Sequence, residues 1–176
     1  TLAPQWLLDL TPAEVEQAVR DRITREVTDM SGPVTVWDAI NEVVIMPVFT
    51  AERNAITPLA QRLGRVGIVR LAFETARAAD PSITLHLNDF NMSPAYERLI
   101  EECLEAGIRI DGLGLQSHMH QGYWGEEKTQ GVLERFARFG LPLHLTETTL
   151  LSGDLMPPEI VDLNDHQVAE WPSTEE

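Results

Sequence analysis

The sequence predicts an α/β fold with a parallel β-sheet, on two observations. Four short apolar segments alternate with four longer segments in which apolar residues recur at helical spacing. Each apolar segment ends in polar residues, and regular alternation of strands and helices implies parallel strands joined by right-handed crossovers. The 176 residues are enough for one ordinary domain.

Four helices are expected before and between the strands. The first follows Thr11-Pro-Ala-Glu14, which has the N-cap residue, the first-turn proline and the acid of a capping box. It is expected to end at Ser31-Gly-Pro33, and the other three helices are expected at residues 63–80, 93–107 and 127–139. The remaining stretches have no clean period and are expected to be mainly loops: residues 1–10, 43–61 and 150–176.

The four strands are expected where β-branched and large apolar residues are concentrated, at residues 34–40, 83–87, 110–115 and 141–145. The first of them is expected to be buried, with Trp37 in the core. Polar residues at the carboxyl ends of all four strands fit both a (β/α)8 barrel and an open doubly wound sheet. No glycine-rich phosphate loop follows any strand, which disfavours a nucleotide-binding sheet. Four strands cannot close a barrel, which normally needs about 250 residues.

Composition limits the partners that the chain can have. The formal net charge of -15 argues against nucleic acids and anionic membranes, because phosphate binding needs clustered Lys and Arg, whereas a neutral substrate is compatible with it. No segment approaches the length of a membrane span. The single cysteine, Cys103, excludes an internal disulfide and is expected in the core. The chain begins without Met, so we expect it to be a piece of a longer protein.

Polar residues at the predicted strand ends form the candidate site. They comprise two carboxylates expected to do chemistry, several amides and one imidazole, without clustered basic residues: Asn41, Glu42, Asn88, Asp89, Asn91, Gln116, His118 and Glu147. Amides and carboxylates suit neutral, hydroxyl-rich ligands, because each sugar hydroxyl needs both a donor and an acceptor. Two carboxylates that converge on one mouth are what glycoside hydrolysis requires.

The motifs that carry these residues resemble glycoside hydrolase family 10, the endo-β-1,4-xylanases. Trp37-Asp-Ala-Ile-Asn-Glu42 resembles that family's acid/base motif, and Leu87-Asn-Asp-Phe-Asn91 resembles the end of its fifth strand. Asp111-Gly-Leu-Gly-Leu-Gln-Ser-His118 is similar to its sixth strand, and Leu143-His-Leu-Thr-Glu147 to its seventh, which carries the nucleophile. The segment from Thr1 to Trp6 looks like the loop after the third strand. The resemblance covers residues 1–150, with the motifs in the family's order.

The resemblance implies a fold, a reaction and a set of roles. The chain would be a partial TIM barrel, strands 4 to 7 with their helices, as one domain over residues 1–176 with its motifs in residues 1–150. Glu42 would be the acid/base and Glu147 the nucleophile of a retaining xylanase that needs no metal or other cofactor. Asn41 would bond the sugar 2-hydroxyl, and His118 would bond Glu147. Asn88, Asn91 and Gln116 would line the cleft, with xylan as partner and an extracellular location.

The chain also departs from the family pattern. Many members have an acid two residues after the nucleophile, and this chain has Thr149 there. The family's first three strands and the eighth strand are missing, with the Lys, His and Trp that grip the reacting sugar. Trp124 and Tyr123, in a Gly-flanked loop, are candidates for stacking on a sugar. We expect the edge strands, 34–40 and 141–146, to need cover from the rest of a barrel or from another chain.

Several alternatives stay open at this stage. Asn88, Asp89 and Asn91 are also able to form an Asx turn that caps the next helix. His118-Met-His120 has a metal-ligand spacing, so with His86 and His144 a metal-dependent barrel hydrolase is the rival enzyme. A carbohydrate-binding fragment without turnover is the alternative outside the enzymes. A β-glycan related to xylan is an alternative substrate.

Overall fold

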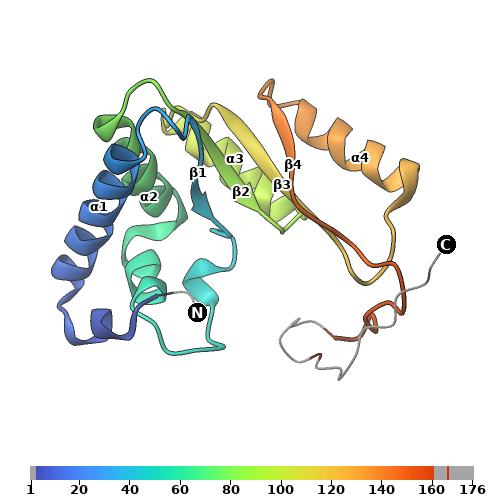
Figure 1. The fold of residues 1–176 in the computed structure, drawn as a ribbon, viewed down its shortest axis with the longest axis horizontal. Coiled ribbons are helices and arrows are strands. Elements are labelled where there is room, and N and C mark those ends of the chain that lie inside the picture. The colour runs from blue at the N-terminus through green and yellow to red at the C-terminus, as the bar shows by residue number, and fades with distance from the viewer. Residues whose placement is uncertain (1–2, 161–165, 167–176) are drawn as a thin grey trace.

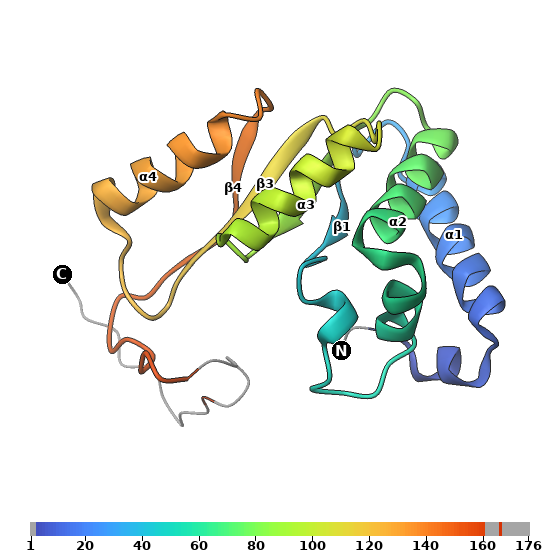
Figure 2. The same cartoon turned by 180° about the vertical axis from the view of Figure 1, so that it is seen from behind.

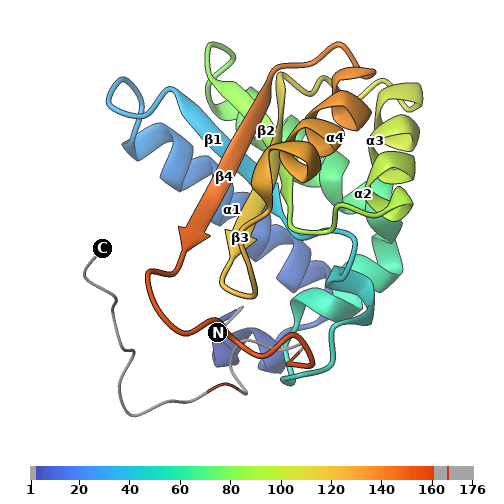
Figure 3. The same ribbon diagram turned by 90° about the vertical axis from the view of Figure 1, so that its right-hand side faces the viewer.

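The computed structural model describes residues 3–160 and 166, and its centre is one four-stranded parallel sheet (Figure 1). The strands lie in sequence order: β1 (Val36–Asn41), β2 (Thr84–Asp89), β3 (Gly112–Met119) and β4 (Leu143–Leu150). All three neighbouring pairs are parallel. The predicted α/β class and strand order are therefore confirmed. The arrowheads of β3 and β4 point to the same side in the view of Figure 3.

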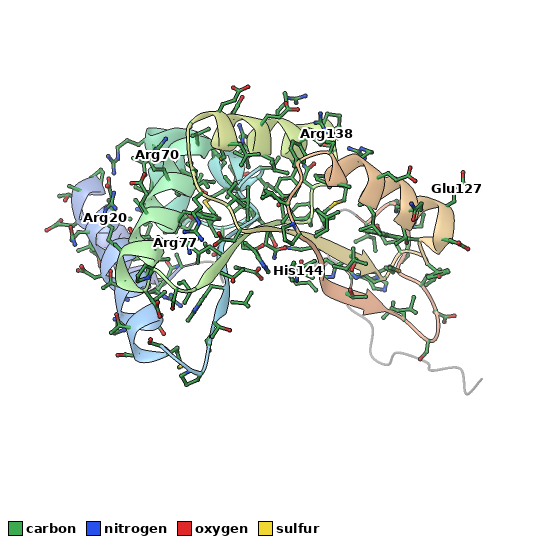
Figure 4. All side chains as sticks on the ribbon, turned by 90° about the horizontal axis from the view of Figure 1, so that it is seen from above. Arg20, Arg70, Arg77, Glu127, Arg138 and His144 are labelled. Atoms are coloured by element: carbon green, nitrogen blue, oxygen red, sulfur yellow. The ribbon has the colours of Figure 1, made fainter. Side chains whose placement is uncertain are left out.

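Four α-helices form a layer along one side of the sheet: α1 (Pro12–Asp29), α2 (Ile56–Ala79), α3 (Pro94–Glu105) and α4 (Gly125–Ala137). Figure 2 shows α3 across β2 and β3, with α1 and α2 toward β1 and α4 toward β4. Two short 3-10 helices, η1 (Gln5–Asp9) and η2 (Met46–Val48), lie within stretches that were predicted as loops. Seen from above, the helices lie on the outer side of the curved sheet (Figure 4). The arrangement is that of part of a barrel.

The predicted start of α1 is confirmed in detail. Thr11 is the N-cap, its hydroxyl accepts a hydrogen bond from the Glu14 backbone N–H, and the Glu14 carboxylate accepts one from the Thr11 backbone N–H. Pro12 occupies the first helical position, where a missing N–H costs nothing. Ser93 and Pro94 begin α3 in the same way, with the Ser93 hydroxyl bonded to the Ala95 N–H.

Helix α2 begins seven residues earlier than predicted, at Ile56 rather than at residue 63. The Asn54 side-chain oxygen accepts hydrogen bonds from the N–H groups of Ile56 and Thr57 and so covers the free donors of the first turn. The helix is interrupted at Gly64, whose φ of 70° and ψ of 166° are not helical. The break shifts the phase of the apolar residues before and after it, which explains why the sequence shows no single period across residues 56–79.

Strands β3 and β4 continue further than predicted, to Met119 and Leu150. The prediction ended both strands where the apolar run ended. The structure keeps the pairing through polar residues, since Gln116 pairs with Thr146 and His118 with Thr149. The polar side chains on the inner face of these strands belong to the candidate site rather than to loops.

The core lies between the sheet and the helices. The residues that fill it are fully buried apolar side chains from β2, β3, α3 and α4, namely Leu85, Leu87, Leu113, Leu115, Tyr96, Leu99, Ile100 and Phe136. Cys103 is buried among them, as predicted, and is a free thiol. The Tyr96 hydroxyl lies 2.7 Å from the Leu87 carbonyl oxygen, to which it donates. This core ties α3 to the two central strands.

The edge strands are much less buried than the central ones. The prediction that residues 34–40 form a buried strand is wrong, because β1 alternates between exposed and half-buried residues. Val36 is 49% exposed on β1, and Leu145 and Leu150 are 44% and 60% exposed on β4. Trp37, expected in the core, is half-buried against it. Within residues 3–160, each outer strand pairs with one neighbouring strand, so one side of each is not covered by another described strand. Within the described residues, none of the helices is both long and apolar enough to cross a membrane.

Candidate active site

Parallel pairing brings the polar carboxyl ends of all four strands to the same end of the sheet. Asn41 pairs with Asn88 between β1 and β2, and Gln116 pairs with Thr146 between β3 and β4. Glu42 follows β1 directly, and Glu147 lies in β4 one residue after Thr146. The two carboxylates, 105 residues apart in the chain, therefore lie at the same end of the sheet.

The centre of the site is the buried amide of Asn88, whose partners come from both edge strands. Its nitrogen donates to the Asn41 side-chain oxygen at 3.0 Å and to a Glu147 carboxylate oxygen at 2.9 Å. Its oxygen accepts from the Thr146 hydroxyl at 2.6 Å. All three hydrogen bonds are made in a residue that is 1% exposed, so the amide is fixed in one orientation.

Gln116 extends this network to Glu42. Its nitrogen lies 2.9 Å from the Asn41 side-chain oxygen and 3.3 Å from a Glu42 carboxylate oxygen, with both of which it forms hydrogen bonds. The Asn41 amide donates to the same Glu42 oxygen at 3.3 Å. Glu42 and Glu147 are thus joined through two amides and one shared acceptor, and no Lys or Arg of the described residues takes part in these hydrogen bonds.

His118 contacts both Gln116 and Glu147 through one ring nitrogen. Nε2 lies 3.1 Å from the Gln116 side-chain oxygen and 3.4 Å from a Glu147 carboxylate oxygen. Both neighbours are acceptors, so Nε2 must carry a hydrogen. Nδ1 lies 3.1 Å from the Thr149 hydroxyl, which is able to donate to a neutral ring or accept from a charged one. His118 is therefore held as a donor toward Glu147 in either protonation state.

Two glycines of β3 make room for the side chains opposite them. A Cβ atom at Gly114 would lie 2.3 Å from the Asn88 side-chain oxygen, and one at Gly112 would lie 2.8 Å from the His86 ring. Gly114 and Thr146 are residues of the site that were not predicted from the sequence. The alternation Gly112-Leu-Gly114-Leu is the signal that could have found the glycines, since glycine within a strand often marks a close approach.

The backbone is unusual at both carboxylates. Glu42 and Glu147, with φ of 55° and 50°, are the two non-glycine residues with positive φ in the described part of the chain. This region is sterically unfavourable for residues with a side chain and is found preferentially at functional sites. Irregular pairing occurs next to both, between Asp38 and Ile40 in β1 and opposite residues 116–118 in β4. Such irregularities re-aim side chains near sites.

Asp89 lies next to this network but faces the helix side of the sheet. Its carboxylate is completely buried and accepts hydrogen bonds from the N–H groups of Val44 at 3.0 Å and Asn91 at 2.9 Å. Burial raises the pKa of Asp89 to about 6, the backbone donors oppose the shift, and the charge of Glu42 adds to it. An Asx turn was one of the alternatives left open for these residues, and it is present at Asp89.

Two of the predicted substrate-binding residues have other contacts. The Asn91 side-chain oxygen accepts from the Ser93 N–H at 3.0 Å and from the Ser93 hydroxyl, at the start of α3. Trp124 precedes α4, is half-buried, and has the Lys128 ammonium 4.7 Å from its ring centre. Tyr123 beside it is 72% exposed. Neither Asn91 nor Trp124 is joined to the carboxylate network by the hydrogen bonds of the described residues, and their binding roles stay predictions.

Four of the five histidines form two separate pairs rather than one cluster. The rings of His118 and His120 are 5.2 Å apart, and those of His86 and His144 are 4.1 Å apart. His86 Nδ1 lies 3.6 Å from a carboxylate oxygen of Asp38, and Nε2 is buried without a partner among the described residues. Across residues 3–160 and 166, no three His, Cys, Asp or Glu side chains are arranged to hold a metal ion. The metal-dependent alternative gains no support from this geometry.

Comparison with known proteins extends these observations. The sequence model of Glycosyl hydrolase family 10 matches residues 2–163. Endo-1,4-beta-xylanase 3 of Hypocrea jecorina is 30% identical over 142 residues, which are 76% of this chain and 39% of the relative. Endo-1,4-beta-xylanase A of Xylanibacter ruminicola is 30% identical over 156 residues, 82% of this chain and 41% of the relative. The chain thus spans about two fifths of these relatives.

Solved structures of xylanases match the fold. Xylanase 10B from Thermotoga petrophila, in complex with xylobiose, has a TM-score of 0.62 and 27% identity, over 80% of this chain and 44% of that one. A thermostable mutant of a xylanase from Cellvibrio japonicus has a TM-score of 0.70 and 23% identity, over 94% of this chain and 51% of that one. The four strands and their helices correspond to about half of each of these structures.

Proposed function

Because the chain belongs to glycosyl hydrolase family 10, we propose that it is the part of a catalytic domain that cleaves β-1,4-xylosidic bonds in xylan. The observation that carries the proposal is the pair Glu42 and Glu147, which come from the two edge strands and meet in one network of amides. We further propose that residues 1–176 belong to a single domain.

The proposed reaction is a double displacement that retains the anomeric configuration. In the first step, the carboxyl proton of Glu42 passes to the glycosidic oxygen and the bond between that oxygen and the anomeric carbon breaks. A carboxylate oxygen of Glu147 bonds to the anomeric carbon. In the second step, ionised Glu42 takes a proton from water, the water oxygen attacks the anomeric carbon, and Glu147 is released.

The hydrogen bonds of Glu147 support its role as nucleophile. The Asn88 amide donates to one carboxylate oxygen and His118 Nε2 faces the other, so both oxygens have a donor that holds the carboxylate in one orientation. Side-chain exposure of 40% leaves the Glu147 carboxylate accessible to a substrate. A carboxylate that is ionised, oriented and accessible is what the attacking group of this mechanism requires.

The surroundings of Glu42 support a role in proton transfer. Its carboxylate oxygen Oε1 accepts from two neutral amides, those of Asn41 and Gln116, and no cation is paired with Glu42 among the described residues. A hollow of about 270 Å³ lies beside it, walled by Ile45, Met46 and Phe49. The hollow leaves space for a leaving group beside the Glu42 carboxyl, as proton transfer to a glycosidic oxygen requires.

Xylan is the proposed substrate because the site is suited to neutral sugars. Amide and imidazole groups line it, and the chain carries a net charge of -15, which disfavours anionic polymers. The relative from Thermotoga petrophila was solved with xylobiose. We propose that Asn41 bonds the 2-hydroxyl of the reacting sugar and that Asn88, Gln116 and His118 hold the carboxylates in place. An extracellular location stays a prediction, and one matching structure is described as an intracellular xylanase.

Reducing-sugar release from xylan and from cellulose tests the proposal. The chain is compared with Glu42→Gln and Glu147→Gln, and with a version extended to a full barrel. We expect hydrolysis of xylan by the extended form and its loss in both variants, because each carboxylate has a separate role. Binding of xylan without any release of reducing sugar in either form would contradict the enzymatic proposal and favour a carbohydrate-binding protein.

A further inference from the structure

The segment that follows β1 is held by hydrogen bonds from two sides at Val44. The Val44 N–H donates to an Asp89 carboxylate oxygen at 3.0 Å. The Val44 carbonyl oxygen accepts from Nε and Nη2 of Arg65, at 3.0 Å and 2.8 Å. Val44 lies two residues after Glu42, and Val43 between them is completely buried. The backbone N–H and C=O of Val44 are therefore both hydrogen-bonded to charged side chains, the first to Asp89 of β2 and the second to Arg65 of α2.

Asp89 uses its two carboxylate oxygens for different tasks. Oδ1 accepts from the Asn91 N–H, which completes the Asx turn before α3. Oδ2 accepts from Val44, 45 residues away in the chain. The turn needs only the first of these bonds. Burying a carboxylate is costly, and Asp89 is 0% exposed. The bond that Oδ2 makes to Val44 therefore indicates a second role for Asp89 beyond the turn.

Arg65 reaches Val44 because α2 is interrupted just before it. Gly64 has a φ of 70° and a ψ of 166°, and a Cβ atom there would meet nothing within 4 Å. Glycine is therefore required at this position by the backbone angle rather than by space. The break costs helical hydrogen bonds, and the Arg65 guanidinium next to it makes two hydrogen bonds to the Val44 carbonyl instead.

We propose that Asp89 and Arg65 are positioning residues that hold Val44 from opposite sides and thereby keep Glu42 in its left-handed backbone conformation, with its carboxylate toward Asn41 and Gln116. The proposal rests on the proposed role of Glu42 in catalysis. A φ of 55° at a glutamate persists only when the surrounding structure determines it. The Glu42 N–H bonds to the Asn88 carbonyl at 2.9 Å, which fixes one side of the residue. The Val44 contacts fix the other side.

The environment of Asp89 gives this arrangement a pH dependence. Burial raises the pKa of Asp89 to about 6, and the charge of Glu42 contributes to the increase. Tyr96, from α3, is the other titratable group coupled to it, and the Asp89 charge adds to the upward shift that burial gives the Tyr96 pKa. Below about pH 6 the Asp89 carboxyl is protonated and becomes a weaker acceptor for the Val44 N–H. The hold on Val44 is therefore expected to loosen as the pH falls through 6.

Asp89→Asn is the main test, because the amide keeps the shape of the side chain and replaces one acceptor by a donor. Asp111→Asn is the matched control. Asp111 also accepts a backbone hydrogen bond, from Leu85 at 3.0 Å, but it precedes β3 at the opposite end of the sheet. Arg65→Lys, which keeps the charge and loses the paired donors, is the second variant in case Asp89→Asn does not fold.

Two kinds of measurement are made on the chain and on its full-barrel extension. NMR gives the amide hydrogen exchange of Val44 and the carbon chemical shifts of Glu42. Kinetics on xylan give kcat and KM. We expect faster exchange at Val44, loss of the left-handed shift pattern at Glu42 and a kcat lowered by roughly 10- to 100-fold with little change in KM. The pH limb of kcat near 6 should disappear in Asp89→Asn. Asp111→Asn should leave all of these unchanged.

Unchanged exchange at Val44 and unchanged Glu42 shifts in both Asp89→Asn and Arg65→Lys would overturn the inference. The same holds if kcat falls equally in Asp111→Asn, because the effect would then be general destabilisation. If neither form hydrolyses xylan, the proposed function fails, whereas the exchange and shift measurements still decide whether Asp89 and Arg65 hold Glu42.

Discussion

Replacing Gly114 by alanine perturbs the site without replacing any of its polar residues. A Cβ atom at residue 114 would lie 2.3 Å from the side-chain oxygen of Asn88 and 2.8 Å from its Cγ. The Asn88 amide has no free direction to move in, since it is bonded to Asn41, Glu147 and Thr146. Relief of the overlap therefore requires that Asn88 leaves its hydrogen bonds or that β2 and β3 separate.

The expected cost follows from these two routes. Overpacking of a well-packed interior costs about 1–3 kcal/mol. Leaving a buried amide without its partners costs about 1–3 kcal/mol. Either route gives the same range, so we expect Gly114→Ala to lower the free energy of unfolding by about 1–3 kcal/mol, as measured by urea denaturation. The rate of xylan hydrolysis should fall by a larger factor than the loss of folded protein explains, because Glu147 loses the donor that orients it.

Gly131→Ala is the matched control for this prediction. Gly131 lies inside α4, and a Cβ atom there would meet nothing within 4 Å. Alanine is the better helix former, so this variant should be more stable by up to about 1 kcal/mol. If Gly114→Ala unfolds at the same urea concentration as the unchanged chain, the close approach of Asn88 to β3 is refuted, and with it our account of how the amide is fixed.

Three further predictions concern neighbouring groups. Thr149→Val should lower xylan hydrolysis by the full-barrel extension, because the His118 ring loses the hydroxyl 3.1 Å from its Nδ1 and is then held on one side only; unchanged hydrolysis would exclude a role for the Nδ1 contact. Burial lowers the pKa of His86, so the folded state resists protonation and stability should be lost as the pH falls through about 6.5. His86→Gln should reduce the difference in unfolding free energy between pH 7.5 and pH 5, and an undiminished difference would assign it to other groups. Tyr96→Phe should cost about 1–3 kcal/mol, because the buried Leu87 carbonyl loses its donor; a cost near zero in thermal unfolding would exclude that role.

The sequence predicted the sheet and the position of the site because both follow from local patterns. Four apolar runs predicted four strands, and parallel connection alone places the ends of these strands together. By this argument Glu42 and Glu147 were expected at the same end of the sheet, and the structure has them there. The capping box at Thr11 was equally local and was predicted to the residue.

The remaining features depend on contacts between distant residues. Asn88 lies between Asn41 and Glu147 only because three strands converge, and the second bond of Asp89 goes to a residue 45 positions away. The break at Gly64 has no signature in the apolar pattern except that the pattern fails. The predicted strands stopped before the polar ends of β3 and β4 because the strand prediction relied on hydrophobicity, while a site on the inner face of a sheet is polar.

The stereochemistry of the first sugar released tests the central claim most directly, that Glu42 and Glu147 act as an acid/base and a nucleophile. Proton NMR follows the anomeric configuration of the product in the first minutes of xylo-oligosaccharide hydrolysis by the full-barrel extension, before mutarotation. The account predicts that the β-anomer forms first, as two successive displacements require. Formation of the α-anomer first, or hydrolysis that persists in Glu147→Gln, would contradict it.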